Sequence, residues 1–399
     1  MSSTRLSVLL NSCLICLVVF LDGDHHDPAT ADSSCSSSSP SSPSSSSSLI
    51  VVCFCMHALS TTAAAARVES RSSGRFHWYY PFMFGDSFAD TGNLAKSSLS
   101  EQSRQWYSPY GRSRPSGHPT GRFSDGIVQS DLVGKILGRY EAPVAYRRTG
   151  KNYVQAAGVN YAVGGSGVYE VPHKAPTLAK QIHYFRKMVE GGTVGKWQLK
   201  SSVALVAVSG NDYAQLSSNS TVDQIESFAG NVTDEIAKGV KHLQKLGVSK
   251  VIVNALHPLG CTPLLTRQLN YTGCDDLRGN AAPYYHNKKL REKLDDDGVY
   301  VVDLYAAFSN IVNPADDAHT HPQVAKKFKR KLKPCCESVD PINGYCGQLD
   351  EDGGAKYSVC SNPDEHFYWD DVHPTQAGWE AVMEQLEWDI KDFLDISSD

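Results

Sequence analysis

From residue 76 onward, short continuous apolar segments alternate with longer amphipathic ones. The apolar segments predict β-strands at residues 76–84, 203–208, 251–256 and 299–304. Because they are continuous rather than alternating, they indicate strands that helices cover on both faces. The amphipathic segments predict helices at residues 124–137, 178–190, 222–246, 284–296 and 375–394. This order of elements predicts an α/β fold, a three-layer α/β/α sandwich around a mainly parallel sheet.

The first 75 residues follow a different pattern. Two apolar segments, residues 6–21 and 49–66, flank a serine tract at residues 33–48. The tract has nothing to bury, so we expect it to be disordered. Each apolar segment resembles part of a signal peptide, and the second ends in small residues of the kind that precede a cleavage site. We therefore divide the chain into a targeting and serine-rich segment, residues 1–75, and a single folded domain, residues 76–399.

Two interpretations of this N-terminal segment stay open. In the first, the true start lies downstream of Met1, and the chain is secreted after cleavage between Ala63 and Ser73. In the second, an apolar segment is an uncleaved signal-anchor followed by a stalk. Membrane contact is expected only in the second case.

Composition excludes one class of partner. The chain is 41% hydrophobic and 20% charged, with a formal net charge of -5, which is typical of a globular protein. It has no basic run of the kind that binds nucleic acid, so we exclude nucleic acid as a partner. We expect a monomer.

The cysteines and sequons favour a secretory route. Beyond residue 75 the cysteines form an even set with no CxxC pair, which favours disulfides over zinc. They are Cys261, Cys274, Cys335, Cys336, Cys346 and Cys360. A bridge between Cys261 and Cys274 is favoured because the loop between them is short and rich in turn-forming residues, and the pairing of the others stays open. Asn-x-Ser/Thr sequons at Asn219, Asn231 and Asn270 are candidate glycosylation sites.

A candidate nucleophile follows the first predicted strand. Ser87 lies on a Gly-Asp-Ser turn, and Asp370 and His373 lie near the C-terminus. A serine hydroxyl needs a nearby base, usually an imidazole that a carboxylate holds in one tautomer. The spacing of Asp370 and His373 can bring the carboxylate to Nδ1 and leave Nε2 facing Ser87. We expect the neighbouring Asp371 to face solvent.

Four short blocks together resemble the plant branch of the GDSL esterase/lipase family, within the SGNH hydrolase superfamily. They occur in family order and span nearly all of residues 80–390. Ser87 is followed by Phe88 where the family name has leucine, which removes no chemistry. The blocks are Gly85-Asp86-Ser87, Asn160-Tyr161-Ala162-Val163-Gly164-Gly165-Ser166-Gly167, Gly210-Asn211-Asp212 and Asp370-x-x-His373-Pro374-Thr375.

The resemblance implies a flavodoxin-like sandwich with a shallow site at one edge of the sheet. It implies Ser87 as nucleophile, His373 as base and Asp370 as the residue that orients the base. It also implies an oxyanion hole made by the Ser87 N–H, the Asn211 amide and a glycine N–H of the second block, for which we choose Gly167 over Gly165. No cofactor and no metal are expected.

The predicted function is a secreted serine esterase or lipase that hydrolyses small-molecule or polymeric esters through an acyl-enzyme. One alternative uses the same site for acyl transfer or for modifying polysaccharide or cutin. The other is a non-catalytic secreted glycoprotein on the same scaffold. The expected location is the cell wall or apoplast, or alternatively the endomembrane lumen. With His373 as base, activity should fall on the acid side.

Two motifs receive a structural interpretation. The string at residues 164–168 ends in Val168, so it lacks the Gly-x-Ser-x-Gly pattern of ordinary α/β-hydrolases. The segment at residues 121–126 is predicted to be a turn followed by the N-cap of a helix.

Overall fold

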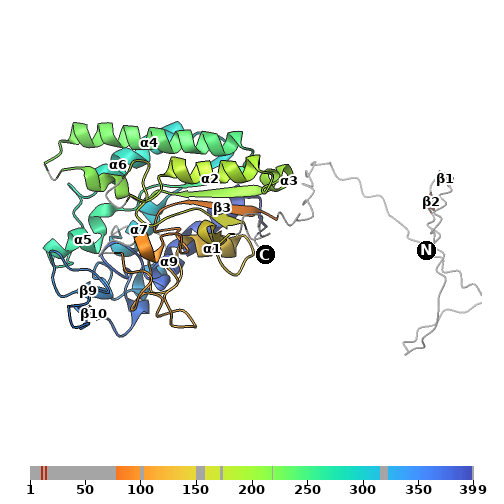
Figure 1. Cartoon of the computed structure of the whole chain (residues 1–399). Helices are drawn as coiled ribbons and strands as arrows, with labels where there is room; N and C mark the ends of the chain where they lie inside the picture. Colours follow the sequence, from red (N-terminus) through yellow and green to blue (C-terminus); the bar gives the residue numbers. More distant parts are fainter. Residues whose placement is uncertain are drawn as a thin grey trace, which may run out of the picture. The chain divides into compact units, whose positions relative to one another are not determined.

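The computed structural model describes residues 10–11, 14–15, 78–98, 103–149, 158–170, 174–217, 219–314 and 322–397. The chain, drawn in Figure 1, divides into two units, Met1–Arg71 and Ser72–Asp399. In the first unit, β1 (Leu10–Asn11) pairs antiparallel with β2 (Leu14–Ile15). The serine tract and the predicted cleavage region lie outside the described residues.

The second unit is built on a six-stranded sheet in the order β4-β5-β3-β6-β7-β8. All neighbouring strands are parallel. The strands are β3 (Tyr80–Gly85), β4 (Val144–Ala145), β5 (Val159–Asn160), β6 (Ser202–Ala207), β7 (Lys250–Asn254) and β8 (Val299–Val302). The prediction of a parallel sheet is therefore confirmed. It missed β4 and β5, which are too short to show an apolar pattern.

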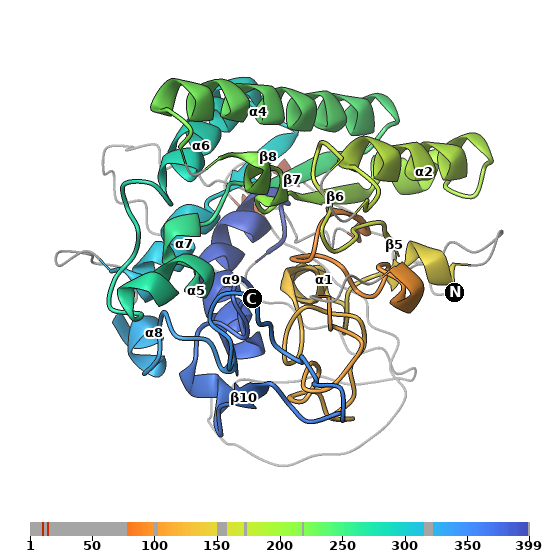
Figure 2. The same ribbon diagram turned by 60° about the vertical axis from the view of Figure 1, so that its left-hand side comes forward.

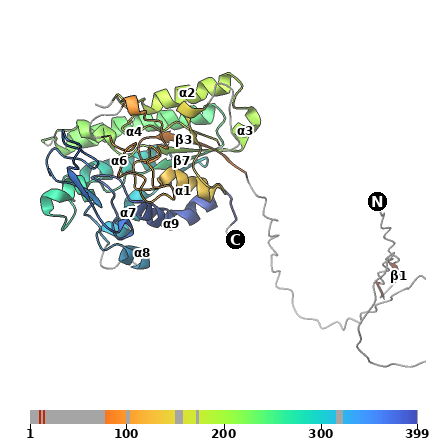
Figure 3. The same ribbon diagram turned by 60° about the horizontal axis from the view of Figure 1, so that its bottom comes forward.

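Helices cover both faces of this sheet (Figures 1 and 2). One layer holds α2 (Leu178–Glu190), α4 (Val222–Lys245) and α6 (Ala281–Lys293). The opposite layer, which Figure 3 turns toward the reader, holds α1 (Gln129–Ile136), α7 (Leu304–Val312) and α9 (Gln376–Phe393). Alternate strand residues feed the two cores: Phe82 and Phe84 pack with the first layer, whereas Met83 packs with the second. The three-layer α/β/α prediction is thus confirmed.

Short elements connect these layers or lie outside them. The small antiparallel ribbon of β9 (Cys336–Ser338) and β10 (Tyr357–Val359) stands apart from the main sheet. The remaining α-helices are α3 (Lys196–Lys200), α5 (Pro263–Thr266) and α8 (Pro322–Lys327). The 3-10 turns are η1 (Lys96–Ser98), η2 (Tyr146–Arg148), η3 (Asn211–Gln215), η4 (Leu259–Cys261), η5 (Arg267–Leu269) and η6 (Pro363–Glu365). None of the helices in the described part of the chain is long and apolar enough to cross a bilayer.

The start of α1 differs from the prediction. The helix begins at Gln129 rather than at residue 124, so the predicted N-cap in the 121–126 segment is wrong. The side chains that were expected to cap it bind the chain ahead of α9 instead. The Ser124 hydroxyl donates to the Pro374 carbonyl at 3.2 Å, and the Gln376 amide donates to the Asp125 carboxylate at 2.7 Å. The segment is therefore a brace between two distant loops.

Polar residues that are distant in the sequence meet at the carboxyl end of the parallel sheet. Ser87 follows β3, and Asn211 follows β6, which pairs directly with β3. Close approach at this edge depends on Gly85, whose φ is +126° and where a Cβ atom would lie 1.9 Å from the Ala207 carbonyl oxygen. In parallel sheets this edge is where functional sites form.

Candidate active site

The structure brings Ser87, His373 and Asp370 together although 286 residues separate the serine from the histidine. His373 Nε2 lies 2.8 Å from the Ser87 hydroxyl oxygen. Its Nδ1 lies 2.8 Å and 2.9 Å from the two Asp370 carboxylate oxygens. This geometry places the Nδ1 proton toward the carboxylate and leaves Nε2 free to accept the serine proton.

Both oxygens of the Asp370 carboxylate accept hydrogen bonds. The backbone amides of Val372 and His373 donate to Oδ1 at 3.0 Å and 2.9 Å, and the Tyr110 hydroxyl donates to Oδ2 at 2.8 Å. Burial acts to raise the pKa of Asp370, but the facing His373 ring and the two amides outweigh it and lower that pKa from its usual value. Asp370 is therefore ionised at neutral pH.

Aromatic rings fix the plane of the histidine. Phe123 packs against the His373 ring with centroids 4.9 Å apart, and Phe88 contacts it edge-on at 6.2 Å. Phe123 belongs to the 121–126 brace, so this segment also orients the candidate base. Sequence reasoning missed that role, because the contact joins residues 250 positions apart in the sequence, as the neighbouring Ser124–Pro374 bond shows.

Asp86 organises the turn that carries Ser87. Its buried carboxylate accepts hydrogen bonds from the Ser209 amide at 2.6 Å, the Ser209 hydroxyl at 2.7 Å and the Phe88 amide at 3.1 Å. A longer bond, 3.2 Å, comes from the Asn211 side chain. Asp86 thus ties the ends of β3 and β6 together. Burial raises its pKa to about 6 despite these donors.

The raised pKa of Asp86 predicts a pH-dependent contribution to stability. Between its ordinary value of 3.8 and about 6, the folded state binds more protons than the unfolded state, so this contribution falls as pH rises through that window. The Asp86→Asn variant cannot ionise here. We expect its free energy of unfolding, relative to the native protein, to rise by up to about 3 kcal/mol from pH 4 to pH 7.

Urea unfolding of both proteins at pH 4, 5, 6 and 7 measures this difference. The slope, rather than the absolute stability, is the test, because asparagine also loses an acceptor at every pH. A difference that stays constant across the window would show that Asp86 does not titrate there.

Two of the three predicted oxyanion donors, the Ser87 N–H and the Asn211 side chain, follow the neighbouring strands β3 and β6. The Ser87 N–H has no acceptor among the described residues. The Asn211 amide donates to the Ser166 carbonyl at 2.8 Å and, more weakly, to Asp86.

The structure favours Gly165 over Gly167 as the backbone donor of the second block. Gly167 is buried, and a Cβ atom there would lie 2.4 Å from the Asp212 carboxylate, so its α-carbon packs against that side chain. Gly165 is partly exposed and has a φ of +79°. The N–H groups of both glycines lack an acceptor among the described residues. It also directly precedes Ser166, which holds Asn211. The packing of Asp212 against Gly167 favours Gly165 as the proposed donor.

Asp371 does not face solvent as predicted. Its carboxylate pairs with Arg267, and its side chain is only 24% exposed. Burial raises the pKa of Asp371 to about 6, although Arg267 opposes the rise. Asp371 therefore anchors the loop before His373 to η5 and takes no part in the Ser87–His373–Asp370 arrangement.

The cysteines beyond residue 75 form three disulfides. Cys261 bonds to Cys274, Cys335 to Cys360 and Cys336 to Cys346. The one cluster of metal-ligand types within the described ranges contains the first of these bridges with Asp276, and its sulfurs are already bonded to each other.

The sequon asparagines Asn219, Asn231 and Asn270 are exposed. Asn219 and Asn231 line the same surface cavity beside α4, together with Phe228 and Asp223. All three side chains are therefore accessible to solvent, as N-glycosylation would require.

The chain is similar to a known family and to proteins of one plant species. The model of the GDSL-like lipase/acylhydrolase family matches residues 82–386. A GDSL esterase/lipase of Arabidopsis thaliana is 35% identical over 85% of this chain and 96% of its own length. A second from the same plant is 36% identical, covering 78% of this chain and 88% of its own.

Proposed function

This chain belongs to the GDSL-like lipase/acylhydrolase family and is a carboxylic ester hydrolase, and from that premise we propose that Ser87 is its nucleophile in a two-step acyl-enzyme reaction. The observation that carries the proposal is the continuous chain of hydrogen bonds from the Ser87 hydroxyl through His373 to Asp370. A nucleophile within hydrogen-bond reach of a base, which a third group orients, is the arrangement that serine esterases need.

In the first step, the Ser87 oxygen attacks the ester carbonyl carbon while His373 Nε2 takes the hydroxyl proton. The imidazolium that forms is stabilised by the ionised Asp370. The tetrahedral intermediate then collapses: the bond to the alkoxy oxygen breaks, that oxygen takes the proton from His373, and the alcohol leaves. Ser87 is left as an acyl ester.

In the second step, water replaces the alcohol. His373 removes a proton from the water as its oxygen attacks the acyl carbon, and a second tetrahedral intermediate forms. Its collapse breaks the bond to Ser87, and His373 returns the proton to the serine oxygen. The products are a carboxylic acid and the regenerated hydroxyl.

Both intermediates carry a negative oxygen, which we assign to the Ser87 N–H, the Gly165 N–H and the Asn211 side chain. These donors are neutral, so they stabilise the oxyanion without forming an ion pair with the reacting groups. Because the fold holds these donors in place before the reaction, they stabilise the oxyanion without having to reorient first. Asn211 is held by Ser166 and Asp86, as described above.

The test of this assignment is Asn211→Ala. We expect the rate of hydrolysis of p-nitrophenyl acetate by the purified protein to fall about 100- to 1000-fold in kcat. KM should change little, because the donor acts on the intermediate. Asn310→Ala is the matched control, since the Asn310 side chain is also half-buried and, within the described ranges, its one hydrogen bond is to Gln385 on α9. A variant with near-native kcat would remove Asn211 from the mechanism.

We further propose that residues 1–75 direct the chain into the secretory pathway and that residues 76–399 form the catalytic domain of a monomer. The three disulfides support this route, because such bonds persist in oxidising compartments. The exposed sequons are consistent with glycosylation there. The expected destination is the cell wall or apoplast. We expect N-terminal sequencing of the secreted protein to find its first residue between Ala63 and Ser73.

A further inference from the structure

We propose that Tyr110 is a positioning residue for this reaction, which holds the Asp370 carboxylate against His373 and is itself held by a disulfide-bonded lobe. The lobe comprises residues 335–360, between its first and last bridged cysteines. The inference rests on the proposed function, because Tyr110 acts only through Asp370. Tyr110 does not contact Ser87 or His373 by any hydrogen bond in the described structure.

The contact between Tyr110 and Asp370 is short and buried. The hydroxyl donates to Oδ2 at 2.8 Å, and the two residues are only 4% and 7% exposed. The two loop amides that bind this carboxylate both reach Oδ1. Oδ2 is approached by His373 Nδ1, at 2.9 Å, and by the Tyr110 hydroxyl. Tyr110 is therefore the one donor from outside the 370–373 loop, among the described residues, that holds the rotation of the carboxylate. Burial, reinforced by Asp370, raises the pKa of Tyr110 well above its usual value, so the hydroxyl remains a donor.

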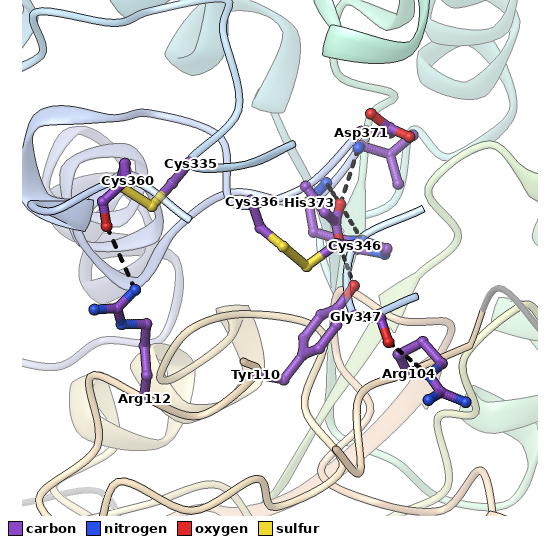
Figure 4. Close-up of a disulfide and its surroundings, with 12 residues drawn as sticks. Arg104, Tyr110, Arg112, Cys335, Cys336, Cys346, Gly347, Cys360, Asp371 and His373 are labelled. Carbon is purple, nitrogen blue, oxygen red and sulfur yellow. Dashed lines mark hydrogen bonds and ion pairs between the residues drawn. A yellow bond between two sulfur atoms is a disulfide. The ribbon is translucent and has the colours of Figure 1, made fainter. Parts of the chain in front are cut away.

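The ring of Tyr110 is seated in the lobe. It packs in one buried cluster with Cys335, Cys336 and Cys346. Trp369, the residue before Asp370, completes this cluster, with its ring centroid 5.9 Å from that of Tyr110. Figure 4 shows Tyr110 rising from its loop beside the Cys336–Cys346 bridge, with its hydroxyl directed toward the segment that carries His373.

The lobe also holds the backbone that leads into Asp370. The Cys335 amide donates to the Tyr368 carbonyl at 3.0 Å, and the Cys336 amide donates to the Trp369 carbonyl at 2.7 Å. Each of these cysteines is bridged to a different part of the lobe. The disulfides therefore support the carboxylate in two ways, through the main chain before it and through Tyr110.

Two arginines join the Tyr110 loop to the lobe, one on each side of the tyrosine (Figure 4). Arg104 Nε donates to the Gly347 carbonyl at 3.2 Å, next to the Cys336–Cys346 bridge. Arg112 donates to the Cys360 carbonyl at 3.4 Å. Both ends of the loop are thus tied to residues at or beside a disulfide, which limits the movement of Tyr110 away from Asp370.

The experiment is Tyr110→Phe, which keeps the ring and removes the hydroxyl. We expect kcat for p-nitrophenyl acetate to fall about 10-fold, the effect of one lost hydrogen bond to a charged group. KM should stay within twofold, and the acid limb of the kcat/KM profile should move to higher pH. The limb moves because the Tyr110 dipole no longer offsets the carboxylate charge, so Asp370 favours the imidazolium form of His373 more strongly.

Tyr368→Phe is the matched control. Tyr368 is fully buried two residues before Asp370, and its hydroxyl has no hydrogen-bond partner among the described residues. A general packing defect would affect both variants alike. If Tyr110→Phe matches Tyr368→Phe in kcat and in the position of the acid limb, the proposal is overturned.

A double-mutant cycle separates this inference from the proposed function. In an Asp370→Asn background, Tyr110→Phe should lower kcat by less than about twofold, because the group through which it acts is already lost. A full 10-fold loss in that background would show that Tyr110 acts by another route. If Asp370→Asn alone leaves kcat unchanged, it is the proposed function that fails. If only Tyr110→Phe is silent, the inference alone fails.

Discussion

Ser87→Ala is expected to lower kcat for short p-nitrophenyl esters by about 10⁵-fold or more, because no other group can then form the acyl-enzyme. The change removes one hydroxyl whose hydrogen bond is made to His373. The side chain is otherwise small and buried, so the fold should be retained. Steady-state hydrolysis and thermal unfolding of the purified variant measure these two expectations.

Ser209→Ala is the matched control for that variant. Ser209 lies at the same edge of the sheet, but its hydroxyl is bonded to the Asp86 carboxylate rather than to a base. We expect its loss of rate to be about 10-fold or less, the cost of one hydrogen bond to a carboxylate. Native rates from Ser87→Ala would show that hydrolysis proceeds without this serine, and the acyl-enzyme mechanism would then be wrong.

Asp370→Asn is expected to lower kcat about 10⁴-fold with little change in the fold. An asparagine can donate to Nδ1 and so favour the tautomer in which Nε2 carries the proton, which prevents His373 from accepting one from Ser87. The loss should be greatest at neutral pH, where the lowered pKa of Asp370 keeps the native carboxylate ionised.

The adjacent carboxylate provides a stringent comparison for Asp370→Asn. Asp371→Asn removes a charge from the same loop but breaks only the pair with Arg267. We expect it to change kcat by less than about 10-fold, and to lower the unfolding temperature slightly. Equal losses from both variants would mean that the loop, rather than the Asp370 carboxylate at Nδ1, determines the rate.

The sequence predicted those parts of the fold that local patterns determine. The bounds of α2 agree at both ends with its amphipathic segment, and β6 and β7 lie within one or two residues of their apolar runs. The start of α1 was wrong because Ser124 and Asp125 bond to a loop 250 residues away. No local signal distinguishes such a brace from an N-cap.

The residues of the candidate site likewise fall into those that local sequence predicts and those that it does not. Ser87, His373, Asp370 and Asn211 are found from short blocks that follow strands or precede a helix. Their supporting residues are not, because the bonds of Asp86 to Ser209 and of Tyr110 to Asp370 span 123 and 260 residues. The choice between Gly165 and Gly167 likewise depends on Asp212, which only the folded chain places against one of them.

The disulfide-bonded lobe determines how late in synthesis the candidate site can assemble. Ser87 follows β3, the first strand of the main sheet in chain order, whereas Asp370, His373 and the bridged cysteines of the lobe are all translated near the end. Ser87 is therefore synthesised long before His373, its proposed base. The support of Asp370 then awaits oxidation of Cys335 and Cys336. On the proposed secretory route, the support of Asp370 is complete only after the chain reaches an oxidising compartment.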